Sequence, residues 1–347
     1  IPLMKRTGFT PAFSGAVEAV ASTGGQIMPP IMGSAAFLVA EFLGVSYSKV
    51  MLAAIIPALL YYLSVYAVVH FESTKLNLTK LPQNMIPKWR DVLSRVHLVI
   101  PLIVVIYILL SGRTPLSASF IAIISTIIVS WIRKDTRMGV KKILKAMENG
   151  AKGSLSVAIA CTVAGLIVGV MTITGLGQVF TYNMVRLSQG YIFFALLLTA
   201  LGCIILSMGL PSAAAYVVVA TVAAPAIIQL GIAPMAAHMF VLYFAIISNI
   251  TPPVALASYT AAGLAGANPK EVGWKAMKLD LAGFIIPFMF AFAPQLILVD
   301  FKFPAIIINI LTACIGVLAL AAATSSFKLF RRVNKPERLL FFAGALT

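Results

Sequence analysis

Two short polar stretches interrupt long apolar runs, and they hold the residues best suited to binding chemistry. The first is Ser22–Pro30 (STGGQIMPP) within the run 10–42, and the second is Ser248–Pro253 (SNITPP) within the run 234–264. Paired prolines remove backbone donors and push the preceding residue out of the α region, whereas proline is well tolerated where a new helix begins. Each run is therefore predicted to be a broken helix, with two half-helices joined by an unwound turn.

A break of this kind is suited to binding ions. In hydrocarbon the freed carbonyls need a partner, and such oxygen ligands suit a hard monovalent cation such as sodium. The half-helices that begin at Pro29 and Pro252 also direct their positive dipole ends and free amides toward the same region, where a carboxylate can bind. A third stretch, Met208–Ser212 (MGLPS), starts a helix after Pro211 inside the apolar run 191–231.

These patterns give two sets of candidate residues, with Na⁺ as the predicted metal and no other cofactor. The predicted cation site comprises Ser22, Thr23, Gly24, Gly25, Ser248, Asn249, Thr251 and Pro252. The predicted carboxylate site comprises Gly209, Pro211, Ser212, Gln26, Asn249 and Thr251.

Membrane-embedded ionisable residues are candidates for carrying protons, and three of them lie near these stretches: Glu18, Glu41 and His238. Each also has a simpler interpretation. Glu18 can pair with Lys5 or Arg6, Glu41 can extend to the membrane surface, and His238 can be a hydrogen-bonded packing residue.

The composition sets the environment of these elements. Of 347 residues 61% are hydrophobic and 10% charged, with a mean hydropathy of +1.01, against about 45–50% and about 25% in an ordinary soluble domain. This excludes disorder, collagen, a coiled coil and a nucleic-acid-binding domain, and predicts an all-α polytopic membrane protein. Cys161, Cys203 and Cys314 lie in apolar runs without metal-ligand spacing, so they are predicted to be buried thiols.

Ordinary spans of about 20 apolar residues are predicted at 50–70, 96–110, 115–132, 153–174, 281–299 and 304–325. The run 191–231 fits either two spans or a re-entrant hairpin, and the basic segment 133–152 fits an amphipathic helix on the membrane surface. Because residues 1–6 look like the end of a helix and 338–347 like the start of another, we expect a piece of a longer polypeptide.

The chain also contains an internal repeat. A shift of 223 residues superimposes Pro2 on Pro225, Gly8 on Gly231, Pro11 on Pro234, Ile27 on Ile250, Pro29 on Pro252 and Pro30 on Pro253, and one gap then aligns Gly44 with Gly266 and Val50 with Val272. We therefore divide the chain into four parts. Residues 1–70 are the remainder of a first repeat, and 71–152 are a cytoplasmic loop, two scaffold spans and the basic surface helix. Residues 153–299 are a second repeat, and 304–347 are a C-terminal span and the start of a further apolar segment.

Charge sets the orientation of the two copies. If each broken helix crosses once, the side opposite the basic clusters receives Lys49, Arg113, Arg186 and Lys302, and most of the net charge of +16 becomes cytoplasmic. The first broken helix then runs outward and the second inward, so the repeats are inverted. Inverted repeats with discontinuous helices are typical of secondary transporters.

The same motifs carry a family resemblance. Gly24–Gly33 (GGQIMPPIMG), followed by Ala40–Gly44 (AEFLG), and Ser248–Ala255 (SNITPPVA) resemble the large membrane subunit of tripartite ATP-independent periplasmic (TRAP) transporters. The resemblance extends from Ile1 to about Phe290 and is closest to the TAXI branch, in which the small and large membrane parts are often fused.

The resemblance implies an elevator-type importer of small organic acids in a prokaryotic cytoplasmic (inner) membrane, not an enzyme. It implies a sodium gradient, or in some members protons, as the driving force. The implied partners are a periplasmic substrate-binding protein, a small membrane subunit or fused helices, and the lipid bilayer. The family's sites match Met208–Ser212, Ser22–Pro30 and Ser248–Pro253, while a hairpin of the first repeat is absent from this sequence.

Two other functions use the same residues. A channel or passive exchanger would use the broken helices as a filter without carrier movement. An intramembrane hydrolase would use Ser212 with His238, but no orienting acid accompanies them and Gly-Leu-Pro-Ser is ordinary helix-start chemistry.

Overall fold

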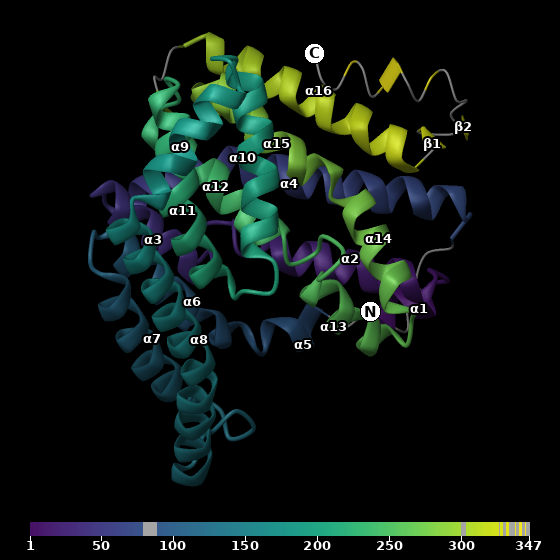
Figure 1. Cartoon of the computed structure of the whole chain (residues 1–347). Coiled ribbons are helices and arrows are strands. Elements are labelled where there is room, and N and C mark those ends of the chain that lie inside the picture. The colour runs from purple at the N-terminus through teal and green to yellow at the C-terminus, as the bar shows by residue number, and fades with distance from the viewer. Residues whose placement is uncertain are drawn as a thin grey trace.

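The computed structural model describes residues 1–78, 89–299 and 303–325, and beyond these residues 327–328, 331–332, 337, 340, 341 and 344. The described part is helical almost throughout (Figure 1), which confirms the predicted all-α fold class. Its elements are α1 (Pro2–Arg6), α2 (Pro11–Gly24), α3 (Ser34–Leu43), α4 (Tyr47–Lys75), α5 (Trp89–Leu93), η2 (Val96–Val99), α6 (Ile100–Leu110), α7 (Pro115–Ser130), α8 (Val140–Thr174), α9 (Leu176–Leu187), α10 (Ile192–Ser207), α11 (Ser212–Gln229), α12 (Pro234–Ile247), α13 (Leu256–Ala265), α14 (Pro269–Leu279), α15 (Leu281–Phe292), η3 (Pro294–Ile297), α16 (Ala305–Ser325) and the paired two-residue strands β1 (Phe327–Lys328) and β2 (Arg331–Arg332).

Both predicted helix breaks are present, but the predicted starts of the second half-helices at Pro29 and Pro252 are wrong. The helices resume only at Ser34 and Leu256, because Met32 and Ala255 adopt left-handed conformations (φ +55° and +39°) after the proline pairs. The helix that starts at Pro11 ends at Gly24 and resumes at Ser34, and the one that starts at Pro234 ends at Ile247 and resumes at Leu256. The first halves, α2 and α12, each have 14 residues, and the second halves, α3 and α13, each have 10. The two copies of the repeat therefore share the same local structure.

The two broken helices lie antiparallel. Helix α2 packs against α13 and α14, whereas α3 packs against α11 and α12 (Figure 1). The first half of each broken helix thus lies beside the second half of the other, which confirms that the repeats are inverted. Gly15 makes the approach possible, because a Cβ there would lie 3.3 Å from the Ala261 carbonyl oxygen.

The stretch 191–231 forms a hairpin. Helices α10 and α11 pack against each other and are joined by the tip Met208–Pro211, where Gly209 has φ +80°. The sequence did not predict α9, which precedes the hairpin. Gly175 adopts a left-handed conformation at the end of α8 and turns the chain into it.

The surface helix expected at 133–152 is not a separate element, so this prediction is wrong. Its residues from Val140 onward continue into the predicted span 153–174 as the 35-residue helix α8. No proline interrupts the segment, and Glu148 pairs with Lys145 and Lys152 one turn away on either side. Pairs at this spacing stabilise a helix by about 0.2–0.5 kcal/mol each and offset part of the cost of Gly150 and Gly153, which weaken a helix without ending it.

The remaining predicted spans have altered bounds. Span 50–70 lies within α4, span 96–110 is η2 and α6, and span 115–132 is α7. Span 281–299 ends early because Pro294 follows α15 and cannot continue its hydrogen bonds, so a short turn, η3, replaces the last part. Within the described residues, α4, α8, α11 and α16 are long and apolar enough to cross a membrane. Residues 79–88, 300–302 and most of 338–347 lie outside the described part of the chain.

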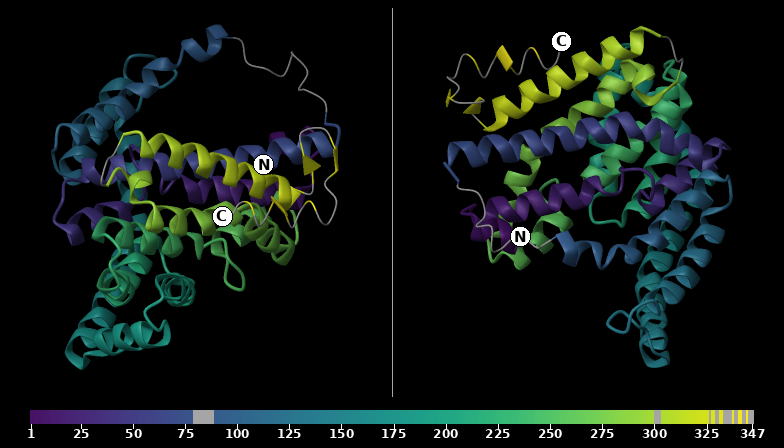
Figure 2. Two further views of the ribbon diagram at one scale, coloured as in Figure 1. Left: turned by 90° about the horizontal axis from the view of Figure 1, so that it is seen from above. Right: turned by 180° about the vertical axis from the view of Figure 1, so that it is seen from behind.

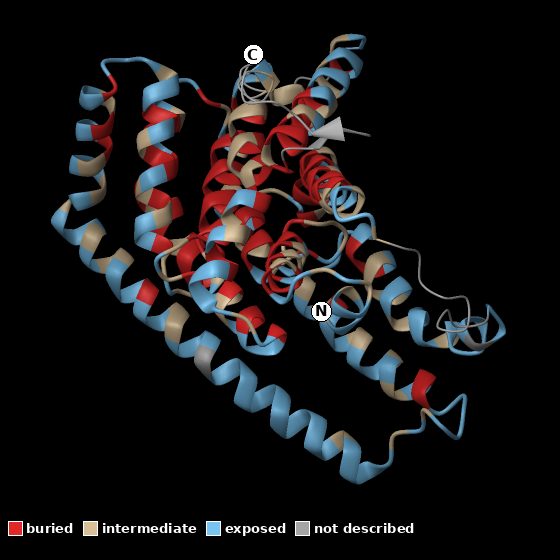
Figure 3. Ribbon diagram, turned by 90° about the vertical axis from the view of Figure 1, so that its right-hand side faces the viewer, coloured by how far each residue is buried: buried red, intermediate tan, exposed pale blue. Residues whose placement is uncertain are grey.

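The packed centre lies around α12, whose residues from Ala236 to Ile247 are all buried. Helices α4 and α16 lie side by side across one face of it (Figure 2). Helix α8, by contrast, is exposed along almost its whole length (Figure 3). An apolar helix exposed in this way is expected to face lipid or another subunit.

We predict that Gly15→Val destabilises the protein, because the added side chain separates α2 from α13 and α14. Overpacking of this kind costs about 1–3 kcal/mol. Thermal unfolding in detergent measures the effect, with Gly169→Val as the control. A Cβ at Gly169 in α8 has nothing within 4 Å. Equal shifts in the two variants would contradict the close approach at Gly15.

Candidate functional site

The side chains of the second break bond back onto the end of α12. Ser248 Oγ donates to the Ala245 carbonyl at 2.8 Å, Asn249 Nδ2 to Ile246 at 3.2 Å, and Thr251 Oγ1 to Ile247 at 2.9 Å. Ser248 and Thr251 are buried, and Asn249 is half-buried. Because these groups use only their hydrogens, the hydroxyl lone pairs and the Asn249 Oδ1 atom are left for a ligand.

Several carbonyls of this break already accept hydrogen bonds from the chain that follows it. The Asn249 oxygen accepts from the Ala257 amide at 2.9 Å, Ile250 from Ser258 Oγ at 3.4 Å, and Pro253 from the Tyr259 hydroxyl at 2.7 Å. The expectation that unwinding leaves carbonyls in need of a partner is therefore too simple. Each of these oxygens still has a second lone pair, so it can contribute to a cation site without depending on the cation.

Tyrosines of α4 hold the first break. Tyr61 donates to the Val20 carbonyl at 2.9 Å, Tyr62 to Ala21 at 2.8 Å, and Tyr47 to Ile31 at 2.8 Å. The Gln26 carbonyl also accepts from the Gly33 amide at 2.8 Å. The sequence analysis missed these tyrosines. Their signal is the placement of large polar-tipped side chains on an apolar helix, where a buried hydroxyl needs a partner.

The candidate residues of the first break point in different directions. Ser22 is exposed and donates to Glu18 Oε1 at 3.2 Å, whereas Thr23 and Gly24 are buried. The ring of Tyr61 lies so close to Gly24 that a Cβ there would be 2.4 Å from it. Gly25 is exposed, and the Gln26 side chain lies against Gly33 of the same turn. This break therefore offers backbone groups more than a single convergent set of side chains.

The tip of the hairpin lies against the second break. Ser248 Oγ lies 3.4 Å from the Ser207 carbonyl, and a Cβ at Gly209 would lie 3.7 Å from Val254. Gly209 and Pro211 are exposed, and Ser212 is half-buried. The structure thus places the candidate residues Gly209 and Ser248 at the contact between the hairpin tip and the second break. Because the tip ends at the level of the break, the arrangement favours a re-entrant hairpin over two complete spans.

The three proposed proton carriers lie in different surroundings. His238 is buried, and its Nδ1 atom lies 2.7 Å from the Tyr216 hydroxyl, so it is paired with α11 and not with Ser212. Glu41 is exposed. Glu18 is exposed as well and lies 3.7 Å from the N-terminal amine. Lys5 instead donates to the Ala265 carbonyl at 2.8 Å, so the expected Glu18–Lys5 pair is wrong.

One acidic residue escaped the sequence analysis altogether. Asp280 lies between α14 and α15 and is 1% exposed. The signal was present in the sequence, where the acid stands inside LDLAGF at the edge of an apolar run. The span predicted at 281–299 begins directly after Asp280, which would leave this carboxyl group at the membrane surface, whereas the fold buries it.

A cavity of about 450 Å³ lies between α8, α9 and α11, and its lining includes Thr181, Tyr182 and Thr221. None of its lining residues belongs to a helix break or to the hairpin tip. The cavity is therefore separate from the candidate site.

Comparison with known proteins identifies one family. The family model described as tripartite ATP-independent periplasmic transporter, DctM component, matches residues 1–305 of the chain. The matched range includes both broken helices and the hairpin. A search of curated proteins gives no match.

We predict that Gly209→Cys and Val254→Cys together form a disulfide on mild oxidation, in a background where the native cysteines are replaced by alanine. A Cβ at Gly209 would lie 3.7 Å from Val254 Cγ1, whose place a cysteine sulfur can take, so the two cysteines lie close enough to be linked. The control is Gly209→Cys with Gly231→Cys, because Gly231 lies at the far end of α11. Gel mobility with and without reductant measures the link. Equal crosslinking in both pairs would contradict the contact.

Proposed function

The chain belongs to the DctM family of tripartite ATP-independent periplasmic transporters, and from this premise we propose that it imports small organic acids together with a coupling cation. The family makes it the membrane permease component of a secondary transporter and a multi-pass membrane protein. Its general partners are a periplasmic binding protein and a small membrane subunit. We further propose the prokaryotic inner membrane as its location and the TAXI branch as its subtype.

The observation that carries this proposal is the antiparallel pair of broken helices with the hairpin tip against the second break. In such an arrangement the helix starts after Pro211 and at Leu256 direct first-turn amides toward the same region, although the Ala257 amide is already bonded to the Asn249 carbonyl. Free amides and positive dipole ends favour an anionic carboxylate. We therefore assign the carboxylate of the substrate to the region of Gly209, Ser212 and Asn249.

The coupling cation is proposed to bind at the breaks. Ser248, Asn249 and Thr251 keep unshared oxygen lone pairs there, and neutral oxygens of this kind suit sodium. A proton is the alternative, because the described part of the chain buries the titratable groups of His238 and Asp280. The position of the site at the interface of the repeats is the one expected for a carrier.

An elevator movement is proposed for the transport cycle. The three tyrosine hydrogen bonds tie α4 to the first broken helix, so we place α4 in the moving unit with α2, α3 and α10–α13. Helices α6 and α7 pack mainly on each other, and α8 is largely exposed. These three are our candidates for the scaffold and for contact with the small subunit.

We predict that uptake into proteoliposomes requires both the binding protein and an ion gradient. The experiment uses the full permease with its small subunit and a panel of ¹⁴C-labelled mono- and dicarboxylates, with glucose as the non-acidic control. Sodium and proton gradients are imposed separately. Uptake without any gradient would contradict coupling, and ionic currents far above carrier turnover would indicate a channel.

A second prediction concerns Asn249→Ala, which removes the free Oδ1 atom from the break. We expect cation-dependent uptake to need a several-fold higher cation concentration, while membrane insertion is unchanged. Thr260→Ala is the matched control, because Thr260 is exposed on α13 and bonds within its own helix at 2.9 Å. An unchanged cation requirement in Asn249→Ala would move the site elsewhere.

A further inference from the structure

The buried carboxyl group of Asp280 has unusual surroundings for an acid. The residue is 1% exposed, and its Oδ2 atom has no hydrogen-bond partner among the described residues. No basic side chain of the described part lies within ion-pair distance of it. A carboxylate without a counterion is very unfavourable in an interior of this kind, whereas the neutral acid is tolerated.

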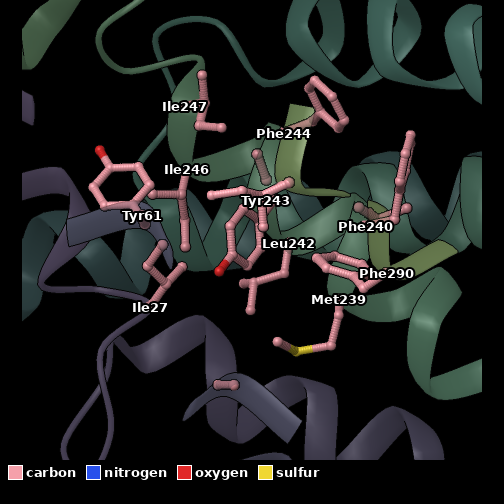
Figure 4. Packing of buried hydrophobic residues seen from close by; sticks show 14 of the residues in the cluster. Ile27, Tyr61, Met239, Phe240, Leu242, Tyr243, Phe244, Ile246, Ile247 and Phe290 are labelled. Atoms are coloured by element: carbon pink, nitrogen blue, oxygen red, sulfur yellow. The ribbon is translucent and has the colours of Figure 1, made fainter. Parts of the chain in front are cut away.

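Two tyrosines interact with this carboxyl group. Tyr61 of α4 and Tyr243 of α12 are both fully buried in the same core (Figure 4), and both interact electrostatically with Asp280. The Tyr243 hydroxyl also lacks a partner among the described residues. Asp280 therefore connects α4, α12 and its own segment at the point where the two repeats meet.

The hydrogen of Tyr61 is already used. Its hydroxyl donates to the Val20 carbonyl at 2.9 Å, and a tyrosine has one hydrogen to give. A protonated Asp280 can donate to the remaining lone pairs of Tyr61 or Tyr243. An ionised Asp280 can only accept, so it competes with the Val20 carbonyl for the Tyr61 hydrogen. The charge state of Asp280 is thereby linked to α2 one turn before the break at Gly25.

The space for this side chain is specific to the second repeat. A Cβ at Gly283 would lie 2.6 Å from Asp280 Oδ2, so glycine is needed there. The spacing that aligns Val50 with Val272 places Ala58 opposite Asp280 and Tyr61 opposite Gly283. The second repeat thus supplies the acid, Asp280, and the space at Gly283 that accommodates it. The first repeat supplies Tyr61, which lies beside the acid.

Other charged groups around Asp280 do not neutralise it. The titratable side chains that face it are Tyr61 and Tyr243, with Tyr62 next to Tyr61. On α14, Lys278 is exposed, and Lys275 pairs with Glu271 at 2.9 Å. Glu18 on α2 is also exposed, and α15 has no charged residue.

We propose that Asp280 binds a proton at the junction of the repeats and that its release changes the hold of Tyr61 on the first broken helix. In the release step the O–H bond of the acid breaks, water accepts the proton, and the Tyr61 hydrogen shifts from the Val20 carbonyl to the carboxylate. The role of this proton in coupling rests on the proposed transport function. The presence of the proton site does not.

Infrared spectroscopy of the full permease in membranes tests the site without any substrate. At pH 7 the wild type is expected to show the C=O band of a protonated carboxylic acid. The band should be lost in Asp280→Asn, shifted in Tyr61→Phe and unchanged in Glu271→Gln, the exposed acid of α14. A band that persists in Asp280→Asn overturns the proposal. A band that disappears when sodium replaces potassium at fixed pH also overturns it, in favour of a sodium ligand.

Uptake experiments test the coupling. For each coupled proton, an inward gradient of one pH unit supports about tenfold accumulation. We expect this accumulation in the wild type and in Glu271→Gln. Asp280→Asn should lose this accumulation while still exchanging labelled for unlabelled solute.

If Asp280→Asn accumulates solute like the wild type, the coupling role of Asp280 is wrong and the transport function stands. If the wild type takes up nothing with its binding protein, the transport function fails, and the infrared result still decides the proton site. Should Asp280→Asn not fold, Tyr61→Phe provides the test through a reduced response to the proton gradient.

Discussion

The structure depends on satisfying backbone polar groups where a helix is interrupted inside an apolar environment. A bilayer offers no water to an open carbonyl, so each break must find its partners within the protein. The two breaks do this differently. The first is held from outside by tyrosine hydroxyls of α4, and the second is held by its own hydroxyl groups and by the start of α13. Both solutions leave oxygen lone pairs unused, so a break can be stable when empty and still has oxygens for the ion that we propose.

The inversion of the repeats brings these two solutions together. Because α2 lies beside α13 and α3 beside α12, each break has the half-helices of the other copy as its neighbours. The copies share lengths and breaks, yet they differ in the side chains at equivalent positions. Tyr61 in one copy and Gly283 in the other show the difference, since the ring of Tyr61 packs against Gly24 whereas Gly283 leaves room for the side chain of Asp280. The two repeats thus share a backbone structure but contribute different polar side chains where they meet.

Much of this could be predicted from the sequence, because prolines and glycines act locally. The paired prolines predicted both breaks, and their fixed spacing predicted the repeat. The predicted bounds of α8 were wrong because glycines weaken a helix without ending it, and no proline lies between the basic segment and the span that follows it. The tyrosine contacts and the burial of Asp280 could not be predicted, because they depend on which helices pack together. Sequence patterns mark where a backbone changes direction, but they do not show which distant side chain meets it.

Asp280 indicates how binding and movement can be linked in such a protein. A neutral acid in the core is compatible with the packed arrangement described above, and a charged one is not unless Tyr61 or water comes to it. The proposed elevator movement keeps α4 and α12 together and so preserves the neutral acid, whereas a local opening within the moving unit that separates these two helices admits water and allows ionisation. Whether Asp280 keeps its proton then depends on whether the junction of the repeats is closed to water. Since Tyr61 also holds α2 beside the first break, a change in that junction reaches the binding region through a single hydroxyl group.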